Sequence, residues 1–211
     1  MNKQTWTGER LTTKGIDDFP WLCAYGLITY GFTAQYCYNK NVLDTFCGLG
    51  FGMNAIGPFC RSISGGDICS KTLDEARELN IKNLYKFRQI DFETESIVES
   101  FGQQFDTIIC LNSIEHIVNP MQFLRNVNEA LTPDGVFILN IPVYCLTDYH
   151  KLIFTFDQAL LVGNDVLDEK EVWLQVGVSI VEYDLTKHNL VDLPGLNSNG
   201  TFVLKKMGKR E

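Results

Sequence analysis

The residues best suited to chemistry are three aspartates at nearly equal intervals and a glycine-rich segment beside the first of them. Asp44, Asp67 and Asp91 are separated by 23 and 24 positions, and residues 47–52 place glycine at every second position. Glycine is needed where the backbone turns with positive φ, or where a ligand lies directly against the main chain. A carboxylate can accept hydrogen bonds from both hydroxyls of a ribose. This combination therefore predicts a site for a nucleoside-containing ligand.

Two histidines are candidates for a catalytic role. His116 directly follows Glu115, and His150 lies beside Asp148 and Tyr149. Each comes after a predicted strand, where a general base could take the proton of a hydroxyl acceptor, a contribution of about 10²–10⁴-fold. The alternatives are a packing role for His116 and a solvated loop position for His150. Glu115 could orient a histidine or the acceptor, or make a structural hydrogen bond.

Short apolar segments that alternate with helical patterns must position these residues, as in a parallel sheet of βαβ units. We expect strands over residues 41–46, 61–66, 84–90, 105–111 and 136–141. A capping box over residues 72–75 and the pair Asn119-Pro120 predict helix starts, and residues 132–135 predict a turn. Residues 156–162 are expected to be helical, and residues 171–180 and 200–206 to be strands. The pattern predicts one α/β domain of three layers, with the aspartates at the carboxyl edge of its sheet.

The ordered set of motifs resembles the class I S-adenosylmethionine-dependent methyltransferases. The matching segments are VLDTFCGLGFG at 42–52, ISGGDICSKTLDEAREL at 63–79, Asp91, and FDTIICLNSIEHIVNPMQFLRNVNEALTPDGVFILNIP at 105–142. The resemblance implies a Rossmann-like three-layer sandwich with a seven-stranded, mostly parallel sheet. Its last strand would be antiparallel, and residues 200–206 could supply it. The implied cofactor is S-adenosyl-L-methionine.

The same resemblance implies the residues of the cofactor site. The glycines would face the methionine part of the cofactor, Asp67 the ribose, and Asp91 with the following aromatic ring the adenine. Asp44 would orient the glycine segment or reach the cofactor's amino group. The implied site comprises Asp44, Gly48, Gly50, Gly52, Asp67, Ile68, Asp91, Phe92, Leu111 and Asn112.

The expected activity is methyl transfer to oxygen or nitrogen of a small molecule. Residues 7–11, with Ala24, Tyr25 and Tyr30, are similar to the leader of methyltransferases of polysaccharide and glycan pathways, which suggests a sugar or glycan precursor. Residues 1–38 are expected to form a helical cap or lid over a domain of residues 39–211. Two alternatives stay open, a catalytically silent partner subunit that binds the cofactor and a nicotinamide-dependent oxidoreductase. Met53, in place of the third glycine of the dinucleotide fingerprint, disfavours the oxidoreductase.

Composition limits the remaining classes of function. Lys+Arg 18 against Asp+Glu 26 gives a formal net charge of −8, which argues against a nucleic-acid substrate. The seven cysteines show no Cys/His spacing typical of zinc, so we expect no metal site and a reducing, cytoplasmic location. Residues 19–39 carry no charge but are too polar for a membrane span. The oligomeric state stays open.

Overall fold

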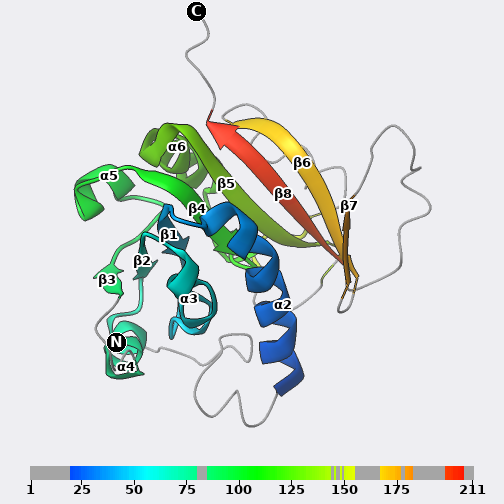
Figure 1. Cartoon of the computed structure of the whole chain (residues 1–211), viewed down its shortest axis with the longest axis horizontal. Coiled ribbons are helices and arrows are strands. Elements are labelled where there is room, and N and C mark those ends of the chain that lie inside the picture. The colour runs from blue at the N-terminus through cyan, green and yellow to red at the C-terminus, as the bar shows by residue number, and fades with distance from the viewer. Residues whose placement is uncertain are drawn as a thin grey trace, which may run out of the picture.

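The computed structural model describes residues 20–79, 85–143, 145, 148, 150–154, 167–176, 179–182 and 198–206. Its elements form a single sheet with helices on both faces (Figure 1). In chain order they are α2 (Pro20–Cys37), β1 (Asn41–Thr45), α3 (Phe51–Ile56), the 3₁₀ helix η1 (Gly57–Phe59), β2 (Ser62–Asp67), α4 (Ser70–Leu79), β3 (Lys86–Gln89), α5 (Ile97–Phe101), β4 (Phe105–Leu111), the 3₁₀ helix η2 (Ile114–His116), α6 (Pro120–Ala130), β5 (Leu131–Val143), β6 (Leu167–Val176), β7 (Ser179–Glu182) and β8 (Ser198–Lys206).

The sheet has the strand order β3-β2-β1-β4-β5-β8-β6-β7. The first five strands in this order are parallel to one another, and β8 pairs with β5 in the antiparallel direction. The expected α/β sandwich with an antiparallel last strand is therefore confirmed. All five parallel strands end at one side of the sheet, which we call the carboxyl edge.

The structure differs from the sequence-based expectation in three elements. Residues 171–180 were expected to be one strand, but β6 ends at Val176 and pairs antiparallel with β7, so that the sheet has eight strands rather than seven. Pairing with β7 covers the outer edge of β6 over Trp173–Val176, part of an otherwise open sheet edge. β5 begins at Leu131 and runs through the expected turn, with a shift of register against β4. The expected helix over residues 156–162 lies outside the described residues.

Two apolar clusters fill the two faces of the sheet, because successive side chains of a strand point to opposite faces. On one face, alternate residues of β1 and β4 pack against α5 and α6, and on the other the intervening residues pack against α2, α3 and α4. The first cluster includes Leu43, Ile108, Phe123 and Val127. The second includes Cys37, Val42, Met53, Leu73 and Ile109.

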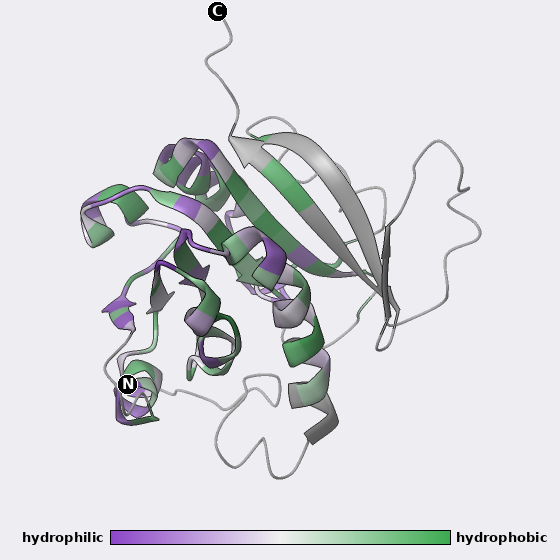
Figure 2. Cartoon of the chain, in the orientation of Figure 1, coloured by the Kyte–Doolittle hydropathy of each residue, from purple (hydrophilic) through white to green (hydrophobic). Residues whose placement is uncertain are grey.

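Helix α2 is tied to the sheet by polar contacts as well as by packing. The Thr107 hydroxyl of β4 donates to the Tyr36 carbonyl at 2.7 Å, and the Tyr30 hydroxyl donates to the Asp44 carboxylate of β1 at 2.9 Å. Figure 2 shows hydrophilic and hydrophobic residues mixed along α2. None of the helices in the described part of the chain is long and apolar enough to cross a membrane.

Replacing Thr107 with valine should destabilise the fold. The side chain is fully buried, so Thr107→Val keeps its volume but removes a donor from the Tyr36 carbonyl. We expect the free energy of unfolding in urea to fall by about 1–3 kcal/mol. Thr94→Val, at an exposed threonine, serves as the matched control and should change stability by no more than about 0.5 kcal/mol. Equal stability of the two variants would contradict this role of the hydroxyl.

Candidate cofactor and acceptor site

The segment between β1 and α3 makes a tight turn at the carboxyl edge. Gly48 and Gly50 have φ angles of 53° and 75°, in the left-handed region that glycine adopts without a steric penalty. The Gly50 amide donates to the Cys47 carbonyl at 2.9 Å. Two of the three glycines predicted to face the cofactor are therefore required by the shape of this turn.

Phe46 precedes these glycines and also has a positive φ, 55°, although it carries a bulky side chain. Such a conformation costs on the order of 1–3 kcal/mol and persists only where surrounding contacts hold it. The Phe46 ring lies 4.9 Å from the Phe92 ring and 5.3 Å from the Phe123 ring, centroid to centroid. This aromatic cluster fixes the strained backbone at the start of the turn, a feature that the sequence analysis did not foresee.

Gly52, in the first turn of α3, is buried against α2. A Cβ added to Gly52 would overlap the ring of Tyr30. The packing of α2 on α3 is therefore a sufficient reason for glycine at this position. Its expected contact with the methionine part of a cofactor stays a prediction.

Asp67, the last residue of β2, joins the glycine turn to the next strand. Its side chain accepts hydrogen bonds from the Gly48 amide at 3.2 Å and from the Cys69 amide at 2.9 Å. The residue is only 2% exposed. The acid predicted to face a ribose thus lies in direct contact with the glycine segment.

Asp44, in β1, is a buried carboxylate whose two oxygens differ in environment. Oδ2 accepts the hydrogen bond from the Tyr30 hydroxyl, whereas Oδ1 is buried with no hydrogen-bond partner. Burial raises the pKa of Asp44 to about 7; the hydrogen bond from Tyr30 acts in the opposite direction, and the nearby Asp67 raises it further. Asp44 is therefore suited to receive a cationic group.

The residues predicted for the adenine end follow β2 and β3. Asp91 is half-buried, and its side chain accepts from the Glu93 amide at 3.0 Å. Phe92 is 1% exposed and lies against Gly66, where a Cβ would overlap its ring. Ile68, by contrast, is 56% exposed, which is unusual for an isoleucine beside a buried strand end. The structure places Phe92 in the core; the contacts of all three residues with adenine or ribose stay predictions.

Leu111 and Asn112, expected to close the pocket, lie where β4 ends. Leu111 is half-buried, and Asn112, like Phe46, is a non-glycine residue with positive φ, 48°. The Asn112 amide donates to the Asn140 carbonyl of β5 at 3.0 Å. This bond fixes the backbone turn that leads directly into η2.

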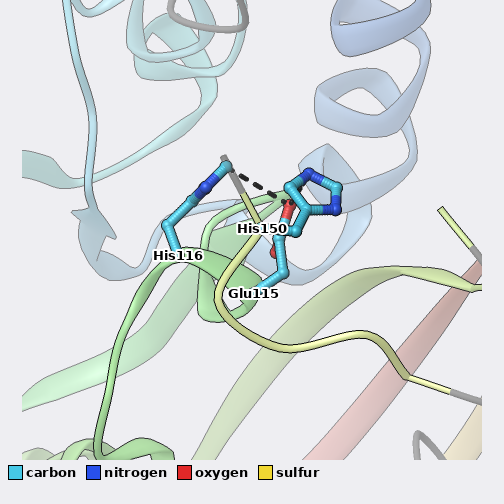
Figure 3. Close-up of side chains that lie close together, drawn as sticks. All are labelled: Glu115, His116 and His150. Atoms are coloured by element: carbon cyan, nitrogen blue, oxygen red, sulfur yellow. Dashed lines mark ion pairs between the residues drawn. The ribbon is translucent and has the colours of Figure 1, made fainter. Parts of the chain in front are cut away.

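The two candidate histidines, 34 positions apart in the chain, meet at Glu115 (Figure 3). Glu115 Oε1 lies 3.7 Å from His116 Nε2 and 4.0 Å from His150 Nε2. The Glu115 carbonyl accepts hydrogen bonds from the amides of Lys151 and Leu152, at 2.9 and 3.0 Å. These backbone bonds hold the segment after β5 against η2, so that both histidines and the glutamate form one cluster at the carboxyl edge.

The structure thus brings together the residues that the sequence predicted for two sites. Asp44, Asp67 and Asp91 lie at or near the ends of neighbouring parallel strands, as expected, and the histidines converge beyond the end of β4. Tyr30 was expected in a lid, and its hydrogen bond to Asp44 was missed because α2 and β1 are brought together only by packing. The central position of Glu115 between the histidines was likewise not apparent from spacing.

Comparison with known proteins finds a match for the part of the chain that contains the glycine turn and the aspartates. Residues 43–137 match the model of a family described as a methyltransferase domain. The ubiquinone biosynthesis O-methyltransferase of Actinobacillus pleuropneumoniae serotype 7 is 27% identical over 131 residues, which cover 60% of this chain and 56% of that relative. The chain therefore matches little more than half the length of this curated relative.

Solved structures share the fold at low sequence identity. The N-methyltransferase NodS of Bradyrhizobium japonicum, in complex with S-adenosyl-L-homocysteine, superposes with a TM-score of 0.65 and 14% identity, covering 97% of this chain and 93% of NodS. The [4+2]-cyclase SpnF superposes with a TM-score of 0.66 and 13% identity, covering 86% and 82%. Residues 43–137, which contain the glycine turn and the three aspartates at the carboxyl edge, are thus similar to a methyltransferase domain, and the chain shares the fold of NodS.

Proposed function

We propose that this protein transfers a methyl group from S-adenosyl-L-methionine to a small molecule, at oxygen or nitrogen. The observation that carries the proposal is the contact of the buried Asp67 carboxylate with the Gly48 amide, beside the buried Asp44. A nucleoside with an attached amino acid needs both an acid for its ribose and a close backbone approach. The glycine turn and Asp67 offer these two features at one point.

The buried oxygen of Asp44 supports the fit to this cofactor. Oδ1 has no hydrogen-bond partner, and the ammonium of the methionine part would supply a donor and a positive charge. Ile68 offers an exposed apolar surface beside Asp67 that could cover the adenosine. When bound, the cofactor supplies a methyl group on a sulfonium; the protein's part is to align the acceptor, which can be worth about 7–11 kcal/mol.

We place the methyl acceptor beside the cluster of Glu115, His116 and His150. This cluster lies beyond the end of β4, at the same carboxyl edge as the glycine turn of the adjacent β1. Its imidazole and carboxylate groups could accept the proton of a hydroxyl. We further propose that residues 1–38 form a cap over the site, which the hydrogen bond from Tyr30 of α2 to Asp44 supports.

A cofactor-binding protein without methyl transfer is the second candidate. The [4+2]-cyclase SpnF has the same fold, so the fold by itself does not determine the reaction. Formation of S-adenosyl-L-homocysteine in the presence of alcohols, phenols or amines separates the two candidates. Product formed with at least one acceptor would support the transferase, whereas binding without turnover across the whole set would favour the second candidate.

Removing the Asp67 carboxylate should weaken cofactor binding. By calorimetry, Asp67→Ala should bind S-adenosyl-L-homocysteine about 10- to 100-fold more weakly, because hydrogen bonds to a charged acceptor contribute about 1.5–3 kcal/mol. Asp134→Ala, at an exposed aspartate near the start of β5, is the matched control and should bind like the wild type. NAD should not bind either protein. Unchanged affinity in a folded Asp67→Ala variant would contradict the assignment of the site.

Cofactor affinity should depend on pH through Asp44. Its pKa of about 7 means that the unliganded protein holds this carboxyl protonated in acid, whereas a bound ammonium favours the carboxylate and lowers the pKa. Binding therefore releases a proton below pH 7, and affinity should rise by up to roughly tenfold per pH unit between about pH 5.5 and 7, then level off.

Calorimetry in buffers of different ionisation enthalpy measures the released proton directly. Asp44→Asn, which keeps the shape and an oxygen for Tyr30, should bind S-adenosyl-L-homocysteine with little pH dependence over the same range. A wild-type affinity that does not change with pH, or a slope that persists in Asp44→Asn, would show that Asp44 does not receive the ammonium.

Loss of His150 should reduce turnover without affecting the cofactor. With an accepted hydroxyl compound, His150→Ala should lower kcat by about 10²–10⁴-fold, while S-adenosyl-L-homocysteine binds as in the wild type. Lys151→Ala, at the exposed neighbouring position, should retain full activity. Equal turnover in the His150→Ala and Lys151→Ala variants would exclude His150 from the reaction.

A further inference from the structure

The cluster at the carboxyl edge brings together three groups that ligate metal ions. Glu115, His116 and His150 each offer one ligand atom, and these atoms all lie within 4.8 Å of one another. Figure 3 shows the two imidazole rings converging on the carboxylate. Two imidazole nitrogens and one carboxylate oxygen are a ligand set used for zinc and for other divalent first-row metals at catalytic sites.

The orientation of the His150 ring favours ligation through Nε2. Nδ1 lies 3.0 Å from the Cys145 carbonyl oxygen, and a carbonyl can only accept, so Nδ1 carries the proton. In the neutral ring Nε2 then has a lone pair, and this is the atom that faces Glu115 Oε1 at 4.0 Å. A hydrogen bond from the second ring nitrogen to a backbone carbonyl is typical of histidines that bind metals.

The three groups are held in place before any ligand arrives. Glu115 and His116 belong to the short helix η2, and the amides of Lys151 and Leu152 bind the Glu115 carbonyl. The side chains of Glu115 and His150 are 2% and 5% exposed, while that of His116 is 34% exposed. The cluster is therefore buried on one side and open on the other, as a site for both a metal and a substrate requires.

We propose that Glu115, His116 and His150 bind a divalent transition-metal cation that holds the oxygen of a hydroxyl acceptor. Ligands of a tetrahedral zinc ion lie about 3.4 Å apart, given metal–ligand distances of about 2.1 Å. The separations of 3.7 and 4.0 Å from Glu115 Oε1 are close to this value, so small side-chain rotations complete the site. Three protein ligands leave at least one position for the acceptor.

A metal ion at this site identifies the methyl acceptor as an alcohol or a phenol. This assignment of the acceptor rests on the proposed function, whereas binding of the metal does not. A cation stabilises negative charge on an acceptor oxygen and so makes an alcohol or phenol reactive near neutral pH. In the transfer, the acceptor O–H bond breaks and its proton goes to solvent. The new carbon–oxygen bond forms as the bond between the methyl carbon and the cofactor sulfur breaks, with its electron pair left on sulfur.

Binding of Co²⁺ tests the site without any need for turnover. Untagged protein, stripped with a chelator, is titrated with Co²⁺, whose visible absorption reports nitrogen and oxygen ligands in a low-symmetry site. We expect one equivalent to bind, and Zn²⁺ to displace it. His116→Ala and Glu115→Gln should each weaken Co²⁺ binding at least about tenfold, because each change removes or weakens one of three ligands. Glu129→Gln, at an exposed glutamate, should bind like the wild type.

The outcomes separate this inference from the proposed function. Absence of a Co²⁺ spectrum, or equal binding by the wild type, His116→Ala and Glu115→Gln, would overturn the metal site and leave the two histidines as proton acceptors only. Binding of S-adenosyl-L-homocysteine, measured on the same samples, shows whether each variant is folded and whether the cofactor assignment stands. If the buried Glu115→Gln variant does not fold, the more exposed His116→Ala variant decides.

Discussion

The parallel alignment of five strands is the constraint on which the rest of this structure depends. The chain moves outward from β1 to β3 and then returns to add β4 and β5 on the other side of β1. Connections therefore diverge at the carboxyl ends of β1 and β4, which leaves a ligand site at that point of the sheet. The glycine turn after β1 and the cluster after β4 occupy the two sides of this divergence.

Several features at this edge oppose stability and are maintained by their surroundings. Asp44 is buried with a raised pKa, and Phe46 and Asn112 have left-handed backbones without being glycine. Strain and perturbed carboxylates concentrate at functional sites, where the fold compensates for them. Here the aromatic packing of Phe46 and the hydrogen bond from Tyr30 provide the compensation.

Similarity to a methyltransferase domain does not determine the chemistry of the acceptor. The family match extends over residues 43–137 and includes the glycine turn, but it ends before His150 and most of the antiparallel part of the sheet. The relatives include an O-methyltransferase of ubiquinone biosynthesis and an N-methyltransferase by name, so they do not select one acceptor atom. The expectation of a sugar acceptor receives no support from them, and residues 7–11, on which it depended, lie outside the described residues.

The sequence by itself determined most of the elements and the edge of the sheet at which the residues predicted for the cofactor lie. Alternating apolar segments predicted the five parallel strands. Asp44, Asp67, Asp91 and the glycines could be placed at the carboxyl edge because each lies near the end of a strand, where local order dictates position. Only the tertiary structure decided contacts between distant segments: Tyr30 with Asp44, Phe46 with Phe123, and His150 with Glu115. These contacts arise because packing and backbone hydrogen bonds place chain segments side by side, and no periodicity within either segment encodes its partner.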